Sequence, residues 1–556
     1  MKRVVSAVCA VVVVVTLAGL QSIGGASATP TAPSVGSFTP TLGTWKQCSS
    51  DGPLECTRLT VPLDYANPDN GKTVSLAVSR LAASPSVTYD GIMLVNPGGP
   101  GASGTGLAYL QGYVPHGAGL HYDWIGFDPR GVGASTPALH CNAKYFGANR
   151  PDFRPTTHKL LHYWLKKSAG YASACGRSAA KTLLPYMTTR DSVQDMESFR
   201  IAYQNQLGPL SPKHAALDKM NYYGFSYGTY LGTVYATLYP TKVGRFVLDG
   251  VVDPTTYWYR SNFDQSIGFD RNINVFFRWM AKNHKTFHLG KNGKKIRRGF
   301  NAELKKLDRH PSAKGKLGPD ELTDAMLDAG YYVFDWVEIG KAYSKLIRTG
   351  RGAGLYSMYA SGNQGAEADN EYAVYDAVQC TDAHRPPLSQ QLRQTRNVAK
   401  KSPFLAWDNT WYNMPCLTWP APSRGKVTVN GSALAKLGTK ILLISETKDA
   451  ATPYAGALNV RSNFKTASLI AGINGTTHAG SLDGVACTDD TVANYLANGI
   501  VPTRKAGRTD DLGCPPNPQP SPTSGARIAD RTSSADPGMP VWLRSELVAA
   551  QEPSLR

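Results

Sequence analysis

The sequence lacks several patterns that mark common protein classes. No Cys-x-x-Cys pair and no His-Glu-x-x-His motif occurs in its 556 residues, which argues against zinc sites of the ribbon and metalloprotease types. Beyond residue 20 no run is long and apolar enough to cross a bilayer. Acidic residues are scarce, with 41 Asp and Glu against 59 Lys and Arg. With 42% hydrophobic residues, the chain is a packed, strongly basic globular protein.

The formal net charge of +18 bears on the partners of the protein. Such an excess favours adhesion to anionic surfaces, whether nucleic acid, cell-wall polymer or membrane. Residues 282–316 carry twelve Lys or Arg but few aromatic residues, which is typical of a solvated face and argues against nucleic-acid binding. His284 and His288 are interpreted as surface histidines, and no metal site is predicted. We expect no nucleic-acid partner and an electrostatic association with an anionic cell wall.

Residues 1–28 have the organisation of a secretory signal peptide. Lys2 and Arg3 precede an apolar core over residues 4–20, and residues 26–28 (Ala-Ser-Ala) supply the small-x-small cleavage pattern. The sequence therefore predicts a secreted protein, with no stable membrane insertion once the signal is removed.

The cysteine content agrees with export. Cys9 leaves with the signal, and an even number in an exported chain indicates disulfide bonds. The remaining eight form four sequence-local couples, so consecutive pairing is the simplest of the 105 connectivities. These couples are Cys48 and Cys56, Cys141 and Cys175, Cys380 and Cys416, and Cys487 and Cys514.

Short apolar runs and helical spacings predict an α/β fold. A hairpin is expected over residues 59–78, and a helix over residues 191–203 separates two apolar runs, which is the doubly wound pattern. Nearly 190 residues with helical spacing separate the apolar run at residues 246–248 from the run at residues 440–444. Buried parallel strands are expected at residues 92–95, 124–127, 220–223, 246–248, 440–444 and 467–470.

These elements predict a division of the chain into segments. The sheet is mostly parallel and is interrupted by a large inserted helical cap. After the signal peptide we expect a flexible leader (29–44), the first part of the core (45–253), the cap (254–437), the second part of the core (438–514) and a Pro- and Ser-rich disordered tail (515–556).

Residues 224–228 (Gly-Phe-Ser-Tyr-Gly) match the Gly-x-Ser-x-Gly nucleophile elbow. The match follows an apolar run and precedes a helix-like segment, as the sharp strand-to-helix turn requires. Ser226 is the candidate nucleophile. The Gly-rich loop at residues 96–101 follows the strand expected at 92–95, so its backbone can approach a substrate oxygen. Gly99 and Tyr227 are the candidate amide donors of an oxyanion hole.

A nucleophile elbow implies that the acid and then the histidine follow the serine along the chain. Of eleven histidines only His478 follows the strand expected at residues 440–444, so His478 is the candidate base. Asp449 is the candidate acid because it lies in a turn beyond the strand end, and Glu446 is the fallback. This arrangement predicts two-step acyl transfer through an acyl-serine, without a cofactor.

Taken together, these motifs resemble those of the secreted tripeptidyl aminopeptidases, which are similar to the prolyl aminopeptidases within the α/β-hydrolase fold. The resemblance implies a peptide substrate with a free N-terminus that is cleaved after its third residue. It is carried by residues 96–101 (Asn-Pro-Gly-Gly-Pro-Gly), 126–133 (Gly-Phe-Asp-Pro-Arg-Gly-Val-Gly), 224–232 (Gly-Phe-Ser-Tyr-Gly-Thr-Tyr-Leu-Gly), 449–453 (Asp-Ala-Ala-Thr-Pro) and the loop of His478, which span roughly residues 45–515.

An aminopeptidase must pair the ammonium group of its substrate with a carboxylate, because an unpaired buried charge is heavily penalised. Asp382, which lies beside Cys380 in the expected cap, is the candidate for this role. Glu371 and Asp376 are the alternatives.

Three other functions compete with the peptidase. A secreted carboxylesterase or lipase-like hydrolase uses the same fold and chemistry. A non-catalytic wall-binding protein is suggested by the basic cap. Residues 99–104 also match Gly-x-Gly-x-x-Gly after a strand, with Asp128 further on, as in dinucleotide-dependent oxidoreductases. Pro100 removes an amide from that loop, and nicotinamide cofactors are scarce outside the cell, so we disfavour this last function.

Overall fold

The computed structural model describes residues 38–50 and 52–522. The predicted signal peptide lies outside the described residues, as do the first part of the predicted leader and the tail beyond residue 522. The leader is not wholly irregular, because Thr41 pairs with Thr60 and Leu42 with Leu59 at the sheet edge. The predicted tail also begins in an ordered way: Asn517 donates its amide to Glu446 at 2.9 Å, and Pro520 accepts a hydrogen bond from Trp279.

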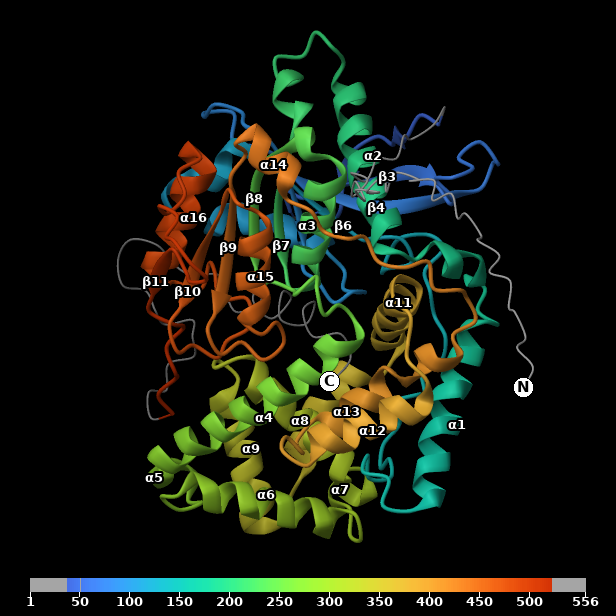
Figure 1. The fold of residues 1–556 in the computed structure, drawn as a ribbon, viewed down its shortest axis with the longest axis vertical. Coiled ribbons are helices and arrows are strands. Elements are labelled where there is room, and N and C mark those ends of the chain that lie inside the picture. The colour runs from blue at the N-terminus through green and yellow to red at the C-terminus, as the bar shows by residue number, and fades with distance from the viewer. Residues whose placement is uncertain (1–37, 51, 523–556) are drawn as a thin grey trace, which may run out of the picture.

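One 11-stranded sheet lies in the upper half of the molecule as drawn in Figure 1. Its strand order is β1-β3-β4-β6-β5-β7-β8-β9-β10-β11, with β2 pairing on β3. Pairs from β6 through β5 to β11 are parallel, whereas β3, β4 and β6 are antiparallel neighbours. The strands are β1 (Thr41–Leu42), β2 (Lys46–Gln47), β3 (Glu55–Pro62), β4 (Thr73–Leu81), β5 (Gly91–Asn96), β6 (Tyr122–Phe127), β7 (Met220–Phe225), β8 (Val243–Asp249), β9 (Ile441–Glu446), β10 (Ala467–Gly472) and β11 (Leu512–Cys514).

Helices cover both faces of the sheet. Alternate strand residues point to opposite sides, and the residues on both sides are apolar and buried. On one face Tyr222 and Leu443 pack with α2, α3 and α15, and on the other Tyr223 and Leu442 pack with η1 and α16. The α-helices around the sheet are α2 (Thr189–Leu207), α3 (Tyr227–Leu238), α14 (Ser432–Leu437), α15 (Ala455–Asn463) and α16 (Ala486–Asn498). The 3₁₀ segments around it are η1 (Thr105–Tyr113), η2 (Pro115–His121), η3 (Lys181–Tyr186), η4 (Ala215–Asp218) and η5 (Pro240–Lys242).

Most of the chain between β8 and β9 builds a helical cap beyond the carboxyl ends of the strands, in the lower half of Figure 1. The cap has its own aromatic core, in which Phe276, Trp279 and Trp336 contact one another. Its elements are α4 (Tyr259–Lys282), α5 (His284–Phe287), α6 (Gly293–Leu307), α7 (Ser312–Gly315), α8 (Pro319–Tyr331), α9 (Trp336–Thr349), α10 (Ala353–Asn363), α11 (Ala366–Asp382), α12 (Leu388–Ala399), α13 (Ala406–Tyr412) and η6 (Met414–Thr418).

Two boundaries of the cap differ from those predicted. Helix α1 (His158–Cys175) precedes the elbow in sequence, yet it packs on the cap, because Trp164 stacks on Trp411. At the other end, Val427, Val429 and Leu434 are buried in the core of the sheet. The apolar side chains of this segment thus pack with those of α3 in the core of the sheet.

The four predicted disulfides are confirmed. The structure joins Cys48 to Cys56, Cys141 to Cys175, Cys380 to Cys416 and Cys487 to Cys514. Cys380 in α11 is thereby tied to η6, and Cys487 in α16 to β11. A search of the described residues finds no helix with the length and apolar character that a membrane crossing needs.

Candidate active site

Ser226 lies on a tight turn between β7 and α3. Its backbone has φ 52° and ψ −123°, a strained conformation for a residue other than glycine. The glycines on either side permit the turn: a Cβ at Gly224 would lie 2.6 Å from the carbonyl oxygen of Gly228, and a Cβ at Gly228 would lie 2.7 Å from that of Asn96. The amide of Ser226 donates to the carbonyl of Asp249 at 2.9 Å. The close packing at the two glycines and the hydrogen bond to Asp249 therefore hold Ser226 in its strained conformation.

Asp449 and His478 are brought together beside this turn. The distance between Nδ1 of His478 and Oδ2 of Asp449 is 2.8 Å, and both side chains are 0% exposed. Thr452 holds the carboxylate, because its amide donates to Oδ1 at 2.9 Å and its hydroxyl to Oδ2 at 2.8 Å. With its Nδ1 proton directed at Asp449, a neutral imidazole presents Nε2 as an acceptor. Nε2 is buried and has no hydrogen-bond partner within the described chain.

Glu446, the fallback acid, does not contact the imidazole. Its two carboxyl oxygens accept hydrogen bonds from the amides of Thr477, at 3.2 Å, and Asn517, at 2.9 Å. Burial raises the pKa of Glu446 to about 8, against the lowering effect of these two hydrogen bonds. A Cβ at Gly475 would lie 1.4 Å from Oε2, so the histidine loop wraps directly over this carboxyl group. Glu446 therefore supports the loop and leaves the contact with His478 to Asp449.

The Gly-rich loop after β5 lies against the elbow. A Cβ at Gly98 would stand 2.8 Å from Cβ of Ser226 and 3.1 Å from the amide nitrogen of Tyr227. Gly99 lines the same pocket as Ser226 and Tyr227. The amide of Tyr227 is the first of α3 and has no partner inside the helix. The two candidate amide donors thus belong to residues that line one pocket with Ser226.

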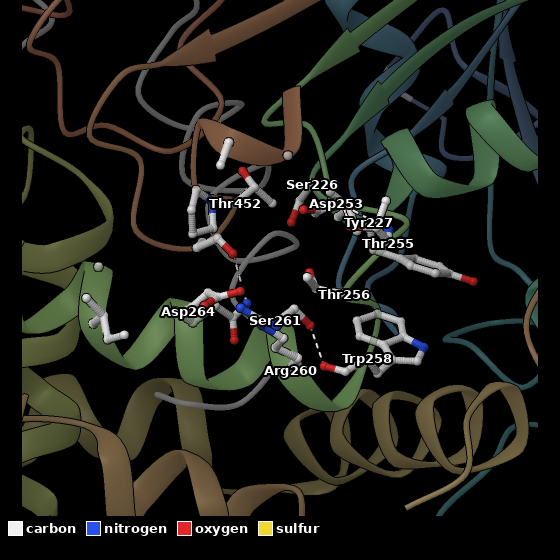
Figure 2. A pocket seen from close by; sticks show the side chains of 18 of the residues that line it. Ser226, Tyr227, Asp253, Thr255, Thr256, Trp258, Arg260, Ser261, Asp264 and Thr452 are labelled. Carbon is white, nitrogen blue, oxygen red and sulfur yellow. Dashed lines mark hydrogen bonds between the residues drawn. The ribbon is translucent and has the colours of Figure 1, made fainter. Parts of the chain in front are cut away.

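A pocket of about 560 Å³ opens beside Ser226. Figure 2 shows Ser226 and Thr452 on one side of it, with Arg260, Ser261 and Asp264 of α4 on the opposite side. Trp258, Tyr331 and Tyr375 add aromatic walls, all of them from the segment between β8 and β9. The cap therefore shapes the space next to the nucleophile.

The candidate residues for binding a substrate ammonium lie outside the lining of this pocket. Asp382 is 1% exposed, and its carboxylate already accepts the amide and hydroxyl of Thr189, at 2.9 and 2.5 Å, and the hydroxyl of Tyr257 at 2.9 Å. Burial raises its pKa to about 6, against these hydrogen bonds. The backbone of Glu371 packs on the Gly-rich loop, since a Cβ at Gly101 would meet its carbonyl oxygen at 2.4 Å. Asp376 is fully buried.

One group of metal-type ligands lies together among the described residues, formed by Asp376, Cys380 and Cys416. Metal ions bind the thiolate form of cysteine. Both sulfur atoms are consumed in a disulfide, so this group does not form a metal site.

Sequence reasoning missed residues that position the histidine. Asp249 accepts the amide and hydroxyl of Ser481, at 2.8 and 2.5 Å, and so anchors the histidine loop under the elbow. Burial raises the pKa of Asp249 to about 6. The backbone of Gly250 lies against the imidazole, because a Cβ there would lie 2.9 Å from Cε1 of His478. An Asp-Gly pair at the end of a buried strand was the only sequence signal for this contact.

The cap also holds the histidine loop. The amide of His478 donates to the carbonyl of Tyr331 at the end of α8, at 2.9 Å, and the Tyr331 ring packs edge-on against the imidazole. The buried side chain of Asn272 in α4 donates to the carbonyl oxygens of Lys448 at 2.9 Å, Gly330 at 3.1 Å and Thr476 at 3.3 Å. One amide group thus links the acid loop, the cap and the histidine loop. No local pattern in the sequence marks Asn272.

Comparison with known proteins identifies the family. Residues 402–509 match the model of a family described as TAP-like protein. A tripeptidyl aminopeptidase from Streptomyces lividans is 33% identical, over 86% of this chain and 87% of the relative. Carboxylesterase B of Mycobacterium tuberculosis is 30% identical (87% and 93%), and the serine protease Hip1 of the same species is 27% identical (88% and 94%). The chain is thus a serine hydrolase with the α/β-hydrolase fold and belongs to the family of the tripeptidyl aminopeptidases.

Proposed function

We propose that this protein is a secreted serine peptidase that releases short peptides, in particular tripeptides, from the free N-termini of its substrates. The observation that carries the proposal is the buried contact of 2.8 Å between Asp449 and His478, beside a pocket that contains Ser226. The 33% identity to a tripeptidyl aminopeptidase supports the choice of substrate. The predicted signal peptide and the four disulfides support export.

In this mechanism His478 accepts the proton of Ser226 through Nε2 while the serine oxygen attacks the substrate carbonyl carbon. Asp449 keeps the Nδ1 proton in place and stabilises the imidazolium that forms. The amides of Tyr227 and Gly99 stabilise the negative oxygen of the tetrahedral intermediate. His478 then gives the proton to the leaving amine as the peptide C–N bond breaks. In the second step His478 takes a proton from a water molecule that attacks the acyl carbon, and it returns that proton to the Ser226 oxygen as the ester bond breaks.

The structure contains no hydrogen bond between Ser226 and Nε2 of His478. Such bonds are often long before substrate binds and shorten in the reactive complex. Because Nε2 is otherwise unpartnered, no competing bond has to break when the serine hydroxyl turns toward it.

The experiment that tests the proposal compares three chromogenic substrates: a tripeptide anilide with a free N-terminus, its N-acetylated form and a simple ester. We expect fast release from the free tripeptide and slow release from the acetylated one. Ser226→Ala should abolish both. Equal rates with and without the acetyl group would refute the aminopeptidase assignment. Export is tested separately, by sequencing the N-terminus of the protein recovered outside the cell, which should begin at residue 29.

A carboxylesterase is the second candidate, favoured by the 30% identity to Carboxylesterase B over 87% of the chain. It uses the same serine, histidine and oxyanion groups but needs no partner for a substrate ammonium. A strong preference for the simple ester over both anilides would select it.

A further inference from the structure

The pocket beside Ser226 contains two carboxylates that the acyl-transfer steps do not use. Asp253 lies in the loop between β8 and α4, and Asp264 lies in the second turn of α4. Both line the pocket together with Ser226. Figure 2 shows Asp264 on the helical wall that faces the nucleophile across the open space.

The two carboxylates differ in how the protein holds them. Asp253 is fixed in its loop: Oδ1 accepts the amide and hydroxyl of Thr255, at 2.9 and 2.7 Å, and Oδ2 accepts the side-chain amide of Asn459 at 2.8 Å. Asp264 forms neither a hydrogen bond nor an ion pair with any residue that the structure describes. Arg260, one helical turn earlier, acts on Asp264 only through its charge. Asp264 therefore keeps its full capacity to accept hydrogen bonds.

The surroundings of Asp264 favour a cationic ligand. The side chain is half-buried, and burial raises its pKa, as does the negative charge of Asp253, while Arg260 lowers it. A carboxylate that loses water without gaining a partner is destabilised, and a cation that enters the pocket relieves this cost. An ammonium group carries three donors and forms charge-assisted hydrogen bonds with a carboxylate.

The position of Asp264 suits the end of a short peptide. Helix α4 runs along the pocket, and at Gly268 it touches the acid loop, because a Cβ there would lie 2.8 Å from Cα of Ala450. Asp264 lies one turn from Gly268, about 6 Å along the helix axis. Two or three extended residues span about 7 to 10 Å. Because Ser226 and Asp264 line the same pocket, we expect an ammonium group two or three residues away from the scissile carbonyl to reach this part of the wall.

We propose that Asp264, reinforced by the negative charge of Asp253, binds the N-terminal ammonium of the peptide substrate. This inference rests on the proposed function and deepens it, since it moves ammonium recognition from Asp382 and Glu371 to the wall of the pocket itself. Asp382 already accepts three hydrogen bonds from Thr189 and Tyr257. Asp264 has the free acceptors and the access that the role requires.

The test measures kcat/KM for the free and the N-acetylated tripeptide anilide with Asp264→Asn, which keeps the shape of the side chain and removes its charge. We expect a loss of about 10- to 100-fold for the free substrate, the range for a hydrogen bond to a charged group, with the acetylated substrate and a simple ester within about twofold of wild type. Arg260→Gln is the matched control of opposite sign on the same helix. Removing its positive charge should raise kcat/KM for the free substrate only.

Each outcome decides the assignment. If Asp264→Asn keeps the wild-type preference for the free substrate, or if Asp382→Asn alone abolishes that preference, the role of Asp264 is refuted while the aminopeptidase proposal stands. If Asp264→Asn slows all substrates equally and lowers the melting temperature, its role is structural. If the wild-type enzyme does not distinguish the free from the acetylated substrate, the aminopeptidase proposal fails first.

Discussion

Gly250 offers a sharp test of how the histidine is positioned. Its backbone has φ +70°, and a Cβ at this position would lie 2.9 Å from Cε1 and 3.2 Å from Nδ1 of His478. Carbon atoms pack at about 3.5 Å or more, so Gly250→Ala should push the imidazole by about 0.6 Å. A displacement of 1 Å can cost about 100-fold in rate, so a shift of this size predicts a loss of roughly tenfold or more in kcat.

Gly438 provides the control for this substitution. It has nearly the same backbone conformation, φ +68°, at the end of α14, and a Cβ there would have nothing within 4 Å. Both alanine variants should lose about 1 to 2 kcal/mol of stability from the left-handed backbone. Only Gly250→Ala should lose activity beyond that.

The assay combines thermal unfolding with turnover of a simple ester, which depends on Ser226 and His478 and not on ammonium recognition. The expected result is a similar drop in melting temperature for both variants and a selective loss of kcat in Gly250→Ala. Full ester turnover in a folded Gly250→Ala protein would show that the imidazole is not held by this contact, and the reasoning would be wrong.

Three further predictions concern the acid and its surroundings. Asp449→Asn should lower kcat by about 10³- to 10⁴-fold, because the imidazole loses its fixed tautomer, whereas Glu446→Gln should keep most of the ester turnover. The folded-state pKa of Glu446, about 8, lies above its usual 4.5, so the folded state binds the extra proton between these values and stability falls as pH rises from about 4.5 to 8. Glu446→Gln should therefore reduce the difference in melting temperature between pH 5 and pH 8, and an unchanged difference would contradict this. Asn272→Ala should lower the free energy of unfolding by about 1 to 3 kcal/mol and should also lower kcat. Asn274→Ala loses only hydrogen bonds to Asp270 in its own helix and should change neither quantity.

The elements that the sequence predicted correctly are those determined by local pattern and chain order. The apolar runs at residues 92–95, 220–223 and 440–444 became β5, β7 and β9, because a strand buried on both faces must be apolar throughout. In a parallel sheet the carboxyl ends of the strands share one edge, so the requirement that the base follow the serine and the acid selected His478 without knowledge of any distance. Its contact with Asp449 agrees with that selection.

The parts that were not predictable depend on packing between distant segments. Nothing local distinguishes Asp264 from any other acid on a basic helix, and its access to the pocket follows only from the way α4 crosses the mouth of the sheet. Conversely, Asp382 was favoured for its place in the cap, but α11 turns its carboxylate toward Thr189. The charge of a residue and its position in the sequence do not reveal whether its side chain faces the substrate pocket.

The hydrogen bonds around His478 limit how the cap can move. The amide of His478 is held by Tyr331, and Asn272 bonds to carbonyl groups of the acid loop, the histidine loop and the cap itself. A cap that swung away as a rigid lid would break several such bonds, each worth about 0.5 to 1.5 kcal/mol, and would release the loop that carries the imidazole. We therefore expect substrate to enter with α4 and α8 in place, because opening the cap would cost the hydrogen bonds that hold the loop of the catalytic histidine.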